Sequence, residues 1–491
     1  MKIFNKYNHI VLKASFLSLL MLGSASCTKN LLDPTVITFI SENNAFDTPD
    51  RIVAQINGLY SSIKSGQFWG GRFIIYNELR ADEFIMNKPN SQTGQNTWSQ
   101  NVGSSTAEVI NLWSAAYATI NRVNTFLEGL ELNKSKITDT QYNNYSGEAK
   151  FIRALCYFSL VQVYAQPYIK DSGASMGLPL RLLAEKSSDN NQLARSSVAQ
   201  IYTQILGDLN AAETGLPLTY ANATLTTTRA HRNTAIALKT RVFLVMGRYA
   251  DVVTEAKKIV STSAPFQAST GVNNKLETSV ATVFGGTYAG AESVFSLPFT
   301  ATEAPGGQNS LAYYFNTAPG NAEFYLNAAG TLADPVYATT STDARKGFIL
   351  TQTGQRWLTK FKVPSTFSDW IPVIRYAEVL LNYAEAAART GDPATAIALV
   401  TAVRKRSDAA YNFSATALLP ANLISTILQE KKIEFLGEGF RVPDLQRLLQ
   451  PLPGKVSVTN TVADVAPAES RYIWPISSAE TSINKLIVQN P

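Results

Sequence analysis

Histidine and cysteine, the side chains that most often carry nucleophilic, redox and zinc chemistry, are scarce in this chain. Its 491 residues include two of each, and only His231 and Cys156 lie beyond the first 27 residues. Four nitrogen and sulfur ligands for a structural zinc ion therefore do not exist here in practice. Beyond those first residues there is no G-x-S-x-G elbow, C-x-x-C pair or Gly-rich phosphate loop, which disfavours triad hydrolysis, thiol redox chemistry and nucleotide binding.

Carboxylates are the groups that are left for catalysis, because glycoside hydrolysis needs only two of them. Glu430, Glu434 and Glu438 follow at i, i+4 and i+8 and would share one helix face. The cations Lys431 and Lys432 lie beside them. This pattern predicts a solvated or ion-paired face in preference to a catalytic or metal-binding row.

Aromatic side chains among polar loop residues are the positive chemical signal. A sugar presents flat C–H faces ringed by hydroxyls, so an aromatic ring covers the face while amide, carboxylate and guanidinium groups bind the hydroxyls. Trp98, with Asn96 and Asn101 close by, has this composition, and so does Gln355-Arg356-Trp357. Each tryptophan is equally consistent with a core anchor beneath its loop, and that alternative stays open.

The first residues have the order of a secretory signal. Three lysines precede an apolar stretch at 14–22, and the small residues 23–26 lead to Cys27. The apolar stretch is too short for a bilayer, which takes about 20 residues to cross. We predict a lipoprotein signal peptide over 1–26, acylation of Cys27, and a lipidated, extended tether over 27–45. Plain cleavage or a buried cysteine is the alternative.

Composition narrows the protein class further. Charged residues make up 16% of the chain, apolar residues 45% and aromatic residues 10%, so the chain should fold. The net charge of +6 includes three lysines of the signal region, which leaves too small an excess to suggest a nucleic-acid partner. Cys156, in a helical pattern, is predicted to be a small buried core residue, and with Cys27 acylated it has no internal disulfide partner.

Apolar residues recur at helical spacing along most of the chain. Thr48-Pro49-Asp50 is typical of a helix start and precedes a run with Ile52 and Ile56. Further helices are predicted at 112–130, 151–164, 198–209, 235–245, 249–260, 376–388, 394–404 and 423–436.

Two junctions between these runs predict helical hairpins. Gly247 separates one pair, and Thr390-Gly391-Asp392-Pro393 separates another. Gly391 suits the left-handed end of a helix, Asp392 suits the next N-cap, and Pro393 suits a first turn. The small residues around these junctions resemble a tetratricopeptide unit, although no strict repeat is present.

The segment at about 262–372, called the insert below, differs from the helical part. It is rich in glycine and proline and has short strand-like runs at 293–297, 347–350 and 357–363. A long irregular segment in a helical protein usually carries function or is disordered, and the aromatic content of the insert favours order. We expect residues 65–105 to form a second loop of this kind.

Six sequence blocks carry a family resemblance. They are EAKFIRALCYFSLVQVYAQ (148–166), DARKGF (343–348), VIRYAEVLLNYAEAAARTGD (373–392), LVTAVRKRS (399–407), ILQEKKIEFLGEGFRVPDLQR (427–447) and WPISSAETSINKLIVQNP (474–491). In this order they resemble the SusD/RagB-like family of nutrient-binding lipoproteins, and the resemblance spans Cys27 to Pro491.

The resemblance implies a mainly α fold, with one SusD-like domain over 46–491. Tetratricopeptide-like helical hairpins would form its scaffold and support a large irregular, loop-rich part with short strands. It also implies an outer-membrane lipoprotein on the cell surface that binds a nutrient, above all an oligosaccharide or polysaccharide. Such a protein hands the nutrient to a SusC-like TonB-dependent transporter without catalysis, and no cofactor or metal is expected. A tetratricopeptide scaffold for proteins and a carboxylate-based glycosidase are the alternative functions.

The resemblance also names candidate ligand contacts. ELRADEF (78–84), followed by Trp98, resembles the segment that supplies part of the pocket in starch-binding members. The expected contacts are Arg80, Asp82, Trp98 and Asn101 on this side and Tyr288, Tyr314 and Trp357 on the other.

Overall fold

The structure, a computed structural model, describes residues 44–285, 289–318, 320–364 and 366–491. The predicted signal peptide, Cys27, almost all of the tether and Tyr288 lie outside the described residues. Contacts divide the chain after Asp47, and the helices and strands belong to the unit Thr48–Pro491. None of the described helices is both long and apolar enough to cross a membrane.

Helices form the scaffold, and most of the long ones are those expected from the apolar spacing. They are α2 (Pro49–Ile63), α3 (Arg72–Leu79), α4 (Gln95–Trp98), α5 (Ala107–Leu132), α6 (Asp139–Tyr164), α7 (Val198–Gly215), α8 (Ala223–Thr228), α9 (Arg232–Val245), α10 (Tyr249–Ala256), α11 (Val280–Gly285), α12 (Leu311–Phe315), α13 (Tyr376–Arg389), α14 (Pro393–Ser407), α15 (Pro420–Glu434), α16 (Arg441–Arg447) and α17 (Ser478–Ile483).

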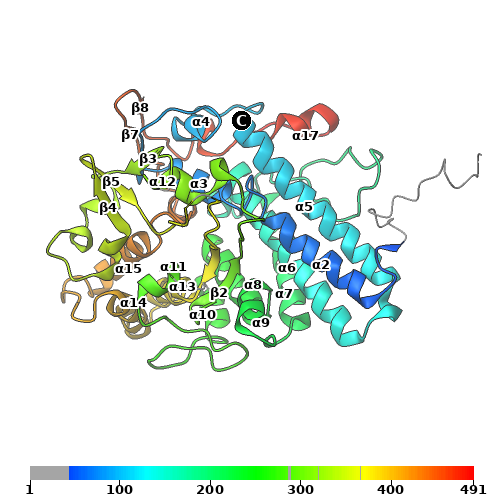
Figure 1. Cartoon of the computed structure of the whole chain (residues 1–491), viewed down its shortest axis with the longest axis horizontal. Coiled ribbons are helices and arrows are strands. Elements are labelled where there is room, and N and C mark those ends of the chain that lie inside the picture. The colour runs from blue at the N-terminus through cyan, green and yellow to red at the C-terminus, as the bar shows by residue number, and fades with distance from the viewer. Residues whose placement is uncertain (1–43, 286–288, 319, 365) are drawn as a thin grey trace, which may run out of the picture. The chain divides into compact units, whose positions relative to one another are not determined.

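The long helices pack side by side in a row. Helix α6 contacts α5 and α7, α7 contacts α9, and α9 contacts α10. The row continues from α10 to α13, which packs on both α14 and α15. Figure 1 shows it running from the blue and cyan helices to the yellow and orange ones. The expected mainly α scaffold of helical hairpins is confirmed.

Local chemistry sets the two predicted hairpin turns. Gly247 and Gly391 have φ of 71° and 87°, values that favour glycine. The Asp392 side chain accepts a hydrogen bond from the Thr395 N–H at 3.1 Å, and Pro393 occupies the first turn of α14. The helix N-cap and C-cap predictions at this junction are therefore confirmed.

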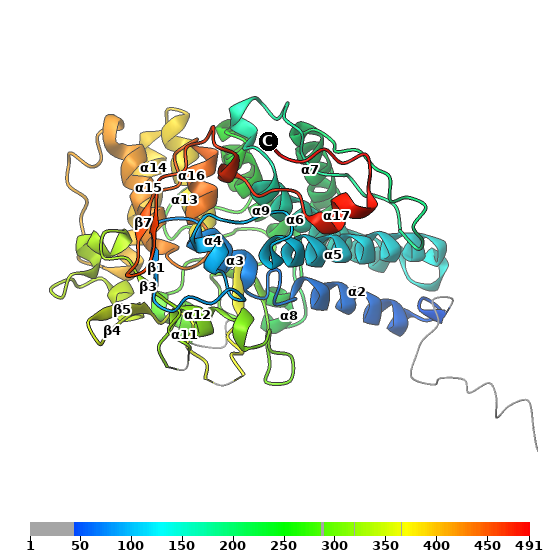
Figure 2. The ribbon, with the colours of Figure 1, turned by 90° about the horizontal axis from the view of Figure 1, so that it is seen from above.

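Short strands tie the insert to the scaffold. The described residues form four antiparallel pairs: β1 (Phe84–Met86) with β3 (Phe324–Leu326), β2 (Ser293–Leu297) with β6 (Ile371–Arg375), β4 (Ile349–Gln352) with β5 (Gln355–Leu358), and β7 (Lys455–Val456) with β8 (Thr461–Val462). Figure 2 shows the insert elements β4, β5, α11 and α12 gathered on one side of α13 to α16.

The prediction of a loop over residues 65–105 is wrong, because this segment contains α3, β1 and α4. All eight residues of α3 are buried, Arg72 and Glu78 included. A helix buried on every side shows no alternation of apolar and polar faces, and so the periodicity that revealed the other helices is missing here.

A buried cluster of ten charged side chains, called the central ion network, joins the insert to α14 and α15. Its members are Glu292, Asp343, Arg345, Lys360, Arg375, Arg404, Arg406, Glu430, Glu434 and Glu438, with side chains at most 6% exposed. Arg375 Nη1 lies 2.5 Å from Glu292 Oε1 and 2.9 Å from Glu434 Oε1. Arg375 Nε contacts Glu438 Oε2 at 2.8 Å.

This network corrects the prediction for the glutamate row. The row is ion-paired as predicted, but it is buried, and its partners come from the insert, β6 and α14 instead of from Lys431 and Lys432. Helix α15 ends at Glu434, and Glu438 is reached through a turn. Burial raises the pKa of Glu434, yet Arg406, Arg375 and Arg345 lower it well below its usual range, so this carboxylate stays charged.

Replacing Arg375 with methionine should strongly destabilise the fold. The substitution leaves Glu292, Glu434 and Glu438 buried with too few cations, at a cost of about 3–5 kcal/mol in the free energy of unfolding. Urea unfolding followed by circular dichroism measures this loss. The control Arg248→Met removes an exposed pair with Asp251 and should cost about 1 kcal/mol or less. Equal losses in the two variants would contradict the role given to the network.

Candidate functional site

Three of the aromatic side chains expected to contact a ligand, those that the structure describes, lie in the core. Trp98 and Tyr314 are 0% exposed and Trp357 is 2% exposed. Trp98 Nε1 donates to the Phe84 carbonyl at 2.8 Å, and Trp357 Nε1 donates to the Gln352 carbonyl at 3.4 Å. These rings offer no open face to a ligand. Trp98 and Trp357 thus match the alternative interpretation of the sequence, in which each tryptophan is a core anchor beneath its loop.

The polar candidates have different environments. Arg80 is fully buried, its Nη2 donates to the Tyr472 carbonyl at 2.7 Å, and burial lowers its pKa to about 10. Lys455 joins Trp98 to the backbone beside Arg80, because its Nζ lies 5.1 Å from the centre of the Trp98 ring and donates to the Ala81 carbonyl at 2.9 Å. Asn101 is exposed.

Asp82 is the predicted residue that lies beside a cavity. It is half-buried, and its Oδ1 is 3.1 Å from Arg441 Nε. Burial raises its pKa, but Arg441 and Lys432 lower it below its usual range, so Asp82 remains a carboxylate. Asp82 thereby positions a pocket-lining arginine.

An open cleft of about 610 Å³ lies where the insert meets the hairpin of α14 and α15. We call it the tyrosine cleft, and its lining includes Asp334, Ser341, Thr342, Asp343, Arg404, Asp408, Tyr411, Phe413, Ser425, Thr426 and Gln429. The half-buried rings of Tyr411 and Phe413 lie at 85° to each other with centres 5.0 Å apart. The Arg404 guanidinium lies 4.4 Å from the Tyr411 ring centre and is held there by Glu430 of the central ion network.

Hydroxyl, amide and carboxylate groups surround these rings. Thr342 Oγ1 donates to Asp408 Oδ2 at 2.9 Å, and Gln429 Nε2 donates to Asp334 Oδ2 at 2.9 Å. Ser425 and Thr426 add hydroxyls from α15. Rings beside many donors and acceptors provide the chemistry that suits a sugar, as a wall for C–H faces with partners for hydroxyls.

Sequence reasoning missed the tyrosine cleft although a signal for it was present. Tyr411-Asn412-Phe413-Ser414 combines aromatic with amide and hydroxyl side chains, as does the sequence around Trp98. This segment lies between two predicted helices of the scaffold, whereas the ligand contacts were expected in the insert and in residues 65–105. Sequence alone does not show that one set of rings is half-exposed and the other buried.

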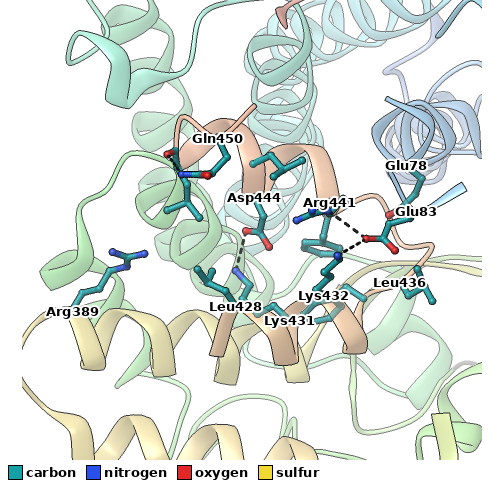
Figure 3. A pocket seen from close by; sticks show the side chains of 14 residues that line it. Glu78, Glu83, Arg389, Leu428, Lys431, Lys432, Leu436, Arg441, Asp444 and Gln450 are labelled. Atoms are coloured by element: carbon teal, nitrogen blue, oxygen red, sulfur yellow. Dashed lines mark hydrogen bonds and ion pairs between the residues drawn. The ribbon is translucent and has the colours of Figure 1, made fainter. Parts of the chain in front are cut away.

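A second cavity, of about 480 Å³, lies between the end of α15 and α16, and we call it the α15–α16 pocket (Figure 3). Its apolar lining consists of Leu428, Phe435, Leu436, Phe440, Leu445 and Leu448. Figure 3 shows Glu78 and Glu83 at one end and Arg389 at the other. Glu83 Oε1 lies 3.1 Å from Lys432 Nζ and 3.5 Å from Arg441 Nε.

Glu78 is the unusual acid of this pocket. Its Oε1 accepts a hydrogen bond from the Gly439 N–H at 2.6 Å, while its buried Oε2 has no partner among the described residues. Burial and then the nearby Glu83 raise the pKa of Glu78 to about 8. The group is therefore mainly a neutral acid at pH 7.

No group of described histidine, cysteine and acidic side chains has the arrangement of a metal site. Cys156 is free and buried, and burial raises the pKa of its thiol, as expected of a core residue. His231 is buried, its Nε2 lies 3.2 Å from the Val294 carbonyl oxygen, and burial lowers its pKa to about 4.

Comparison with known proteins gives the family. A family described as "Starch-binding associating with outer membrane" matches residues 38–244, and the SusD family matches residues 308–491. A SusD superfamily protein of known structure from Bacteroides fragilis is 34% identical, with 90% of this chain and 99% of that chain covered and a TM-score of 0.81. The chain belongs to the SusD/RagB-like family.

Two further relatives are more distant in sequence. SusD-like protein P38 from Formosa agariphila is 23% identical over 532 residues, which cover 97% of this chain and 98% of that protein. A laminarin-binding SusD-like protein shares the fold, at 20% identity and a TM-score of 0.69, with 90% of this chain and 99% of that chain covered.

Glu78 should make the fold less stable as pH rises. A carboxyl group whose pKa is higher in the folded state than in the unfolded state stabilises the fold fully at pH values below its unfolded pKa. This contribution is lost as pH rises through the folded pKa of Glu78, about 8. Glu78→Gln keeps the shape of the neutral acid and cannot ionise. Between pH 5 and pH 8 the variant should therefore lose less unfolding free energy than the wild type, by on the order of 3 kcal/mol.

Urea unfolding at pH 5, 6, 7 and 8 measures this difference. Glu303→Gln is the matched control, because Glu303 is exposed and Lys64 lowers its pKa below this range. Parallel pH profiles for the wild type and Glu78→Gln would show that Glu78 is already ionised at pH 5.

Proposed function

We propose that this protein is a cell-surface lipoprotein that binds an oligosaccharide in the tyrosine cleft and passes it to a TonB-dependent outer-membrane transporter. The acylated Cys27 would hold it at the outer membrane, and the transporter would be of the SusC-like kind. The observation that carries the proposal is a solvent-open cleft in which two half-buried rings stand beside hydroxyl, amide and carboxylate groups.

The family supports this function. One matching family description names starch binding and association with the outer membrane, and a protein with the same fold binds laminarin. Both glycans are neutral, which agrees with the weak net charge of this chain.

Capture without bond cleavage fits the carboxylates of the cleft. Both oxygens of Asp343 bind Arg345, Asp334 binds Gln429 and the Val336 N–H, and Asp408 binds Thr342. These bonds engage each acid in local structure, whereas a glycosidase needs an acid and a base that both face one glycosidic bond. A protein-only scaffold gives no role to half-exposed rings among sugar-binding groups.

Removing the Tyr411 ring should weaken glycan binding. Residues 28–491, which retain the whole unit Thr48–Pro491, are tested by calorimetry and affinity electrophoresis against neutral glucans. Tyr411→Ala should bind about tenfold more weakly, because it loses the ring face that covers the sugar. The control Tyr142→Ala removes a half-buried ring from α6, outside the cleft, and should bind as the wild type does.

The same assay separates the alternative functions. Release of reducing ends, abolished by substitution of one acid in the cleft, would identify a glycosidase. Glycan binding that is identical in Tyr411→Ala and the wild type would remove the tyrosine cleft from the proposal. Failure of every glycan in the panel would favour the scaffold for proteins.

Acylation of Cys27 should hold the full-length protein at the membrane, and loss of that acylation should release it. The wild type should enter the detergent phase of a Triton X-114 separation and incorporate labelled palmitate, because acyl chains on Cys27 anchor it. Mild detergent extraction should also recover the transporter with it. Cys27→Ser should stay in the aqueous phase without label, and an aqueous, unlabelled wild type would contradict the anchor.

A further inference from the structure

The α15–α16 pocket has the features of a small-molecule site, and it is separate from the tyrosine cleft. The two cavities are lined from different faces of α15, with Ser425, Thr426 and Gln429 in the cleft and Leu428 and Lys432 in the pocket. Its volume of about 480 Å³ lies within the range of about 300–1,000 Å³ typical of ligand pockets.

The lining of the pocket predicts the body of its ligand. Leucine and phenylalanine side chains form most of it, with Phe435 and Phe440 supplying rings 4.6 Å apart. A sugar would leave many hydroxyls without partners against such a surface, because burying an unpaired hydroxyl is unfavourable. An aryl or branched alkyl group gains from the same surface.

The charged end of the pocket predicts the head of the ligand. Arg441 uses its Nε for Asp82 and Glu83, and no described residue accepts a hydrogen bond from its two terminal nitrogens. Lys432 has three N–H groups and one carboxylate partner at 3.1 Å, Glu83. Both side chains are about one-fifth exposed, so their unused donors are within reach of a bound molecule.

The two acids at this end of the pocket do not turn it into a site for a cationic head group. Glu83 already accepts from the Thr331 N–H and pairs with Lys432, and Glu78 is mainly neutral at pH 7. Surplus donors beside one ion-paired acid and one neutral acid favour a group that only accepts hydrogen bonds. A carboxylate is the compact group of this type that an arginine and a lysine bind best.

We propose that the α15–α16 pocket binds a small organic acid, with its aryl or branched alkyl body against Phe435 and Phe440 and its carboxylate at Arg441 and Lys432. The site is independent of glycan binding, so either proposal can fail while the other stands. A cationic or neutral ligand of the same shape is the competing possibility that the experiment must separate.

Three isosteric probes test the head group, titrated into residues 28–491 by calorimetry and ligand-observed NMR. They are 3-phenylpropionate, 3-phenylpropionamide and 3-phenylpropylamine. The acid should show saturable binding, the amide should bind about tenfold more weakly, and the amine should not bind. No binding of the acid, or amine binding as tight as acid binding, would overturn the proposal.

Variants test the location. Arg441→Gln and Lys432→Gln should each weaken binding of 3-phenylpropionate about tenfold, while Arg471→Gln, which alters an exposed pair with Glu469, should leave it unchanged. Leu448→Trp should fill the cavity, abolish acid binding and leave glycan binding intact. Thermal unfolding of each variant checks its fold, and unchanged acid affinity in both Arg441→Gln and Lys432→Gln would refute the site.

The pH dependence of acid binding tests whether the carboxylate of the ligand lies near Glu78. A purely structural effect of Arg441 and Lys432 would not produce this dependence. Glu83, Glu438, Lys360 and the Gly439 N–H surround Glu78. Ionisation of Glu78 places a negative charge near the bound carboxylate, so wild-type affinity for the acid should fall between pH 7 and pH 9. The fall should be smaller in Glu78→Gln, and equal pH profiles would contradict the placement of the carboxylate at this end.

Discussion

Ten charged side chains buried together between the insert and the last helices are the constraint on which the rest of the structure depends. The central ion network contains five carboxylates and five cations, which come from the insert, β6, α14, α15 and the turn after it. A buried charge is tolerated only where opposite charges and hydrogen bonds surround it, so each member fixes the positions of its partners. The irregular insert therefore has one defined position on the helical scaffold, although it contains little regular secondary structure of its own.

Helix α15 contributes residues to the central ion network and to both cavities. Glu430 and Glu434 face the network, Gln429 faces the tyrosine cleft, and Lys432 faces the α15–α16 pocket. Successive residues of a helix are rotated by about 100°, so three sides of one helix serve three environments. Arg404 links the network to the tyrosine cleft, because the guanidinium that pairs with Glu430 also lies against the Tyr411 ring. On the opposite side, the turn that carries Glu438 also presents the Gly439 N–H to Glu78. The network thus borders the tyrosine cleft directly through Arg404 and Asp343, and it lies one contact away from the α15–α16 pocket.

The sequence allowed the scaffold to be predicted because its signals are local. Caps such as Asp392, left-handed glycines such as Gly391 and the period of apolar residues each act within a few positions. The ion partners were not predictable in this way, since Arg375 meets Glu292 and Glu434 across long stretches of chain. The exposure of a ring is equally non-local: Trp98 and Tyr411 have similar polar neighbours in sequence, but the first is buried beneath Lys455 and the second borders an open cleft. Helix α3 was missed because it is buried on all sides, its polar residues included, and so has no exposed polar face.

The pairing of β2 with β6 brings together the two ends of residues 293–375, which include most of the insert. Ser293 lies opposite Arg375, and the Tyr376 N–H donates to the Glu292 carbonyl at 2.8 Å. The entropy of closing a loop grows only slowly with its length. Exposed loops between these two anchor points can therefore be lengthened or shortened at small cost, provided that the charged residues and the buried rings of the insert are kept. This arrangement separates a supporting frame from outer loops that can change in length without disturbing the stacking of the helices.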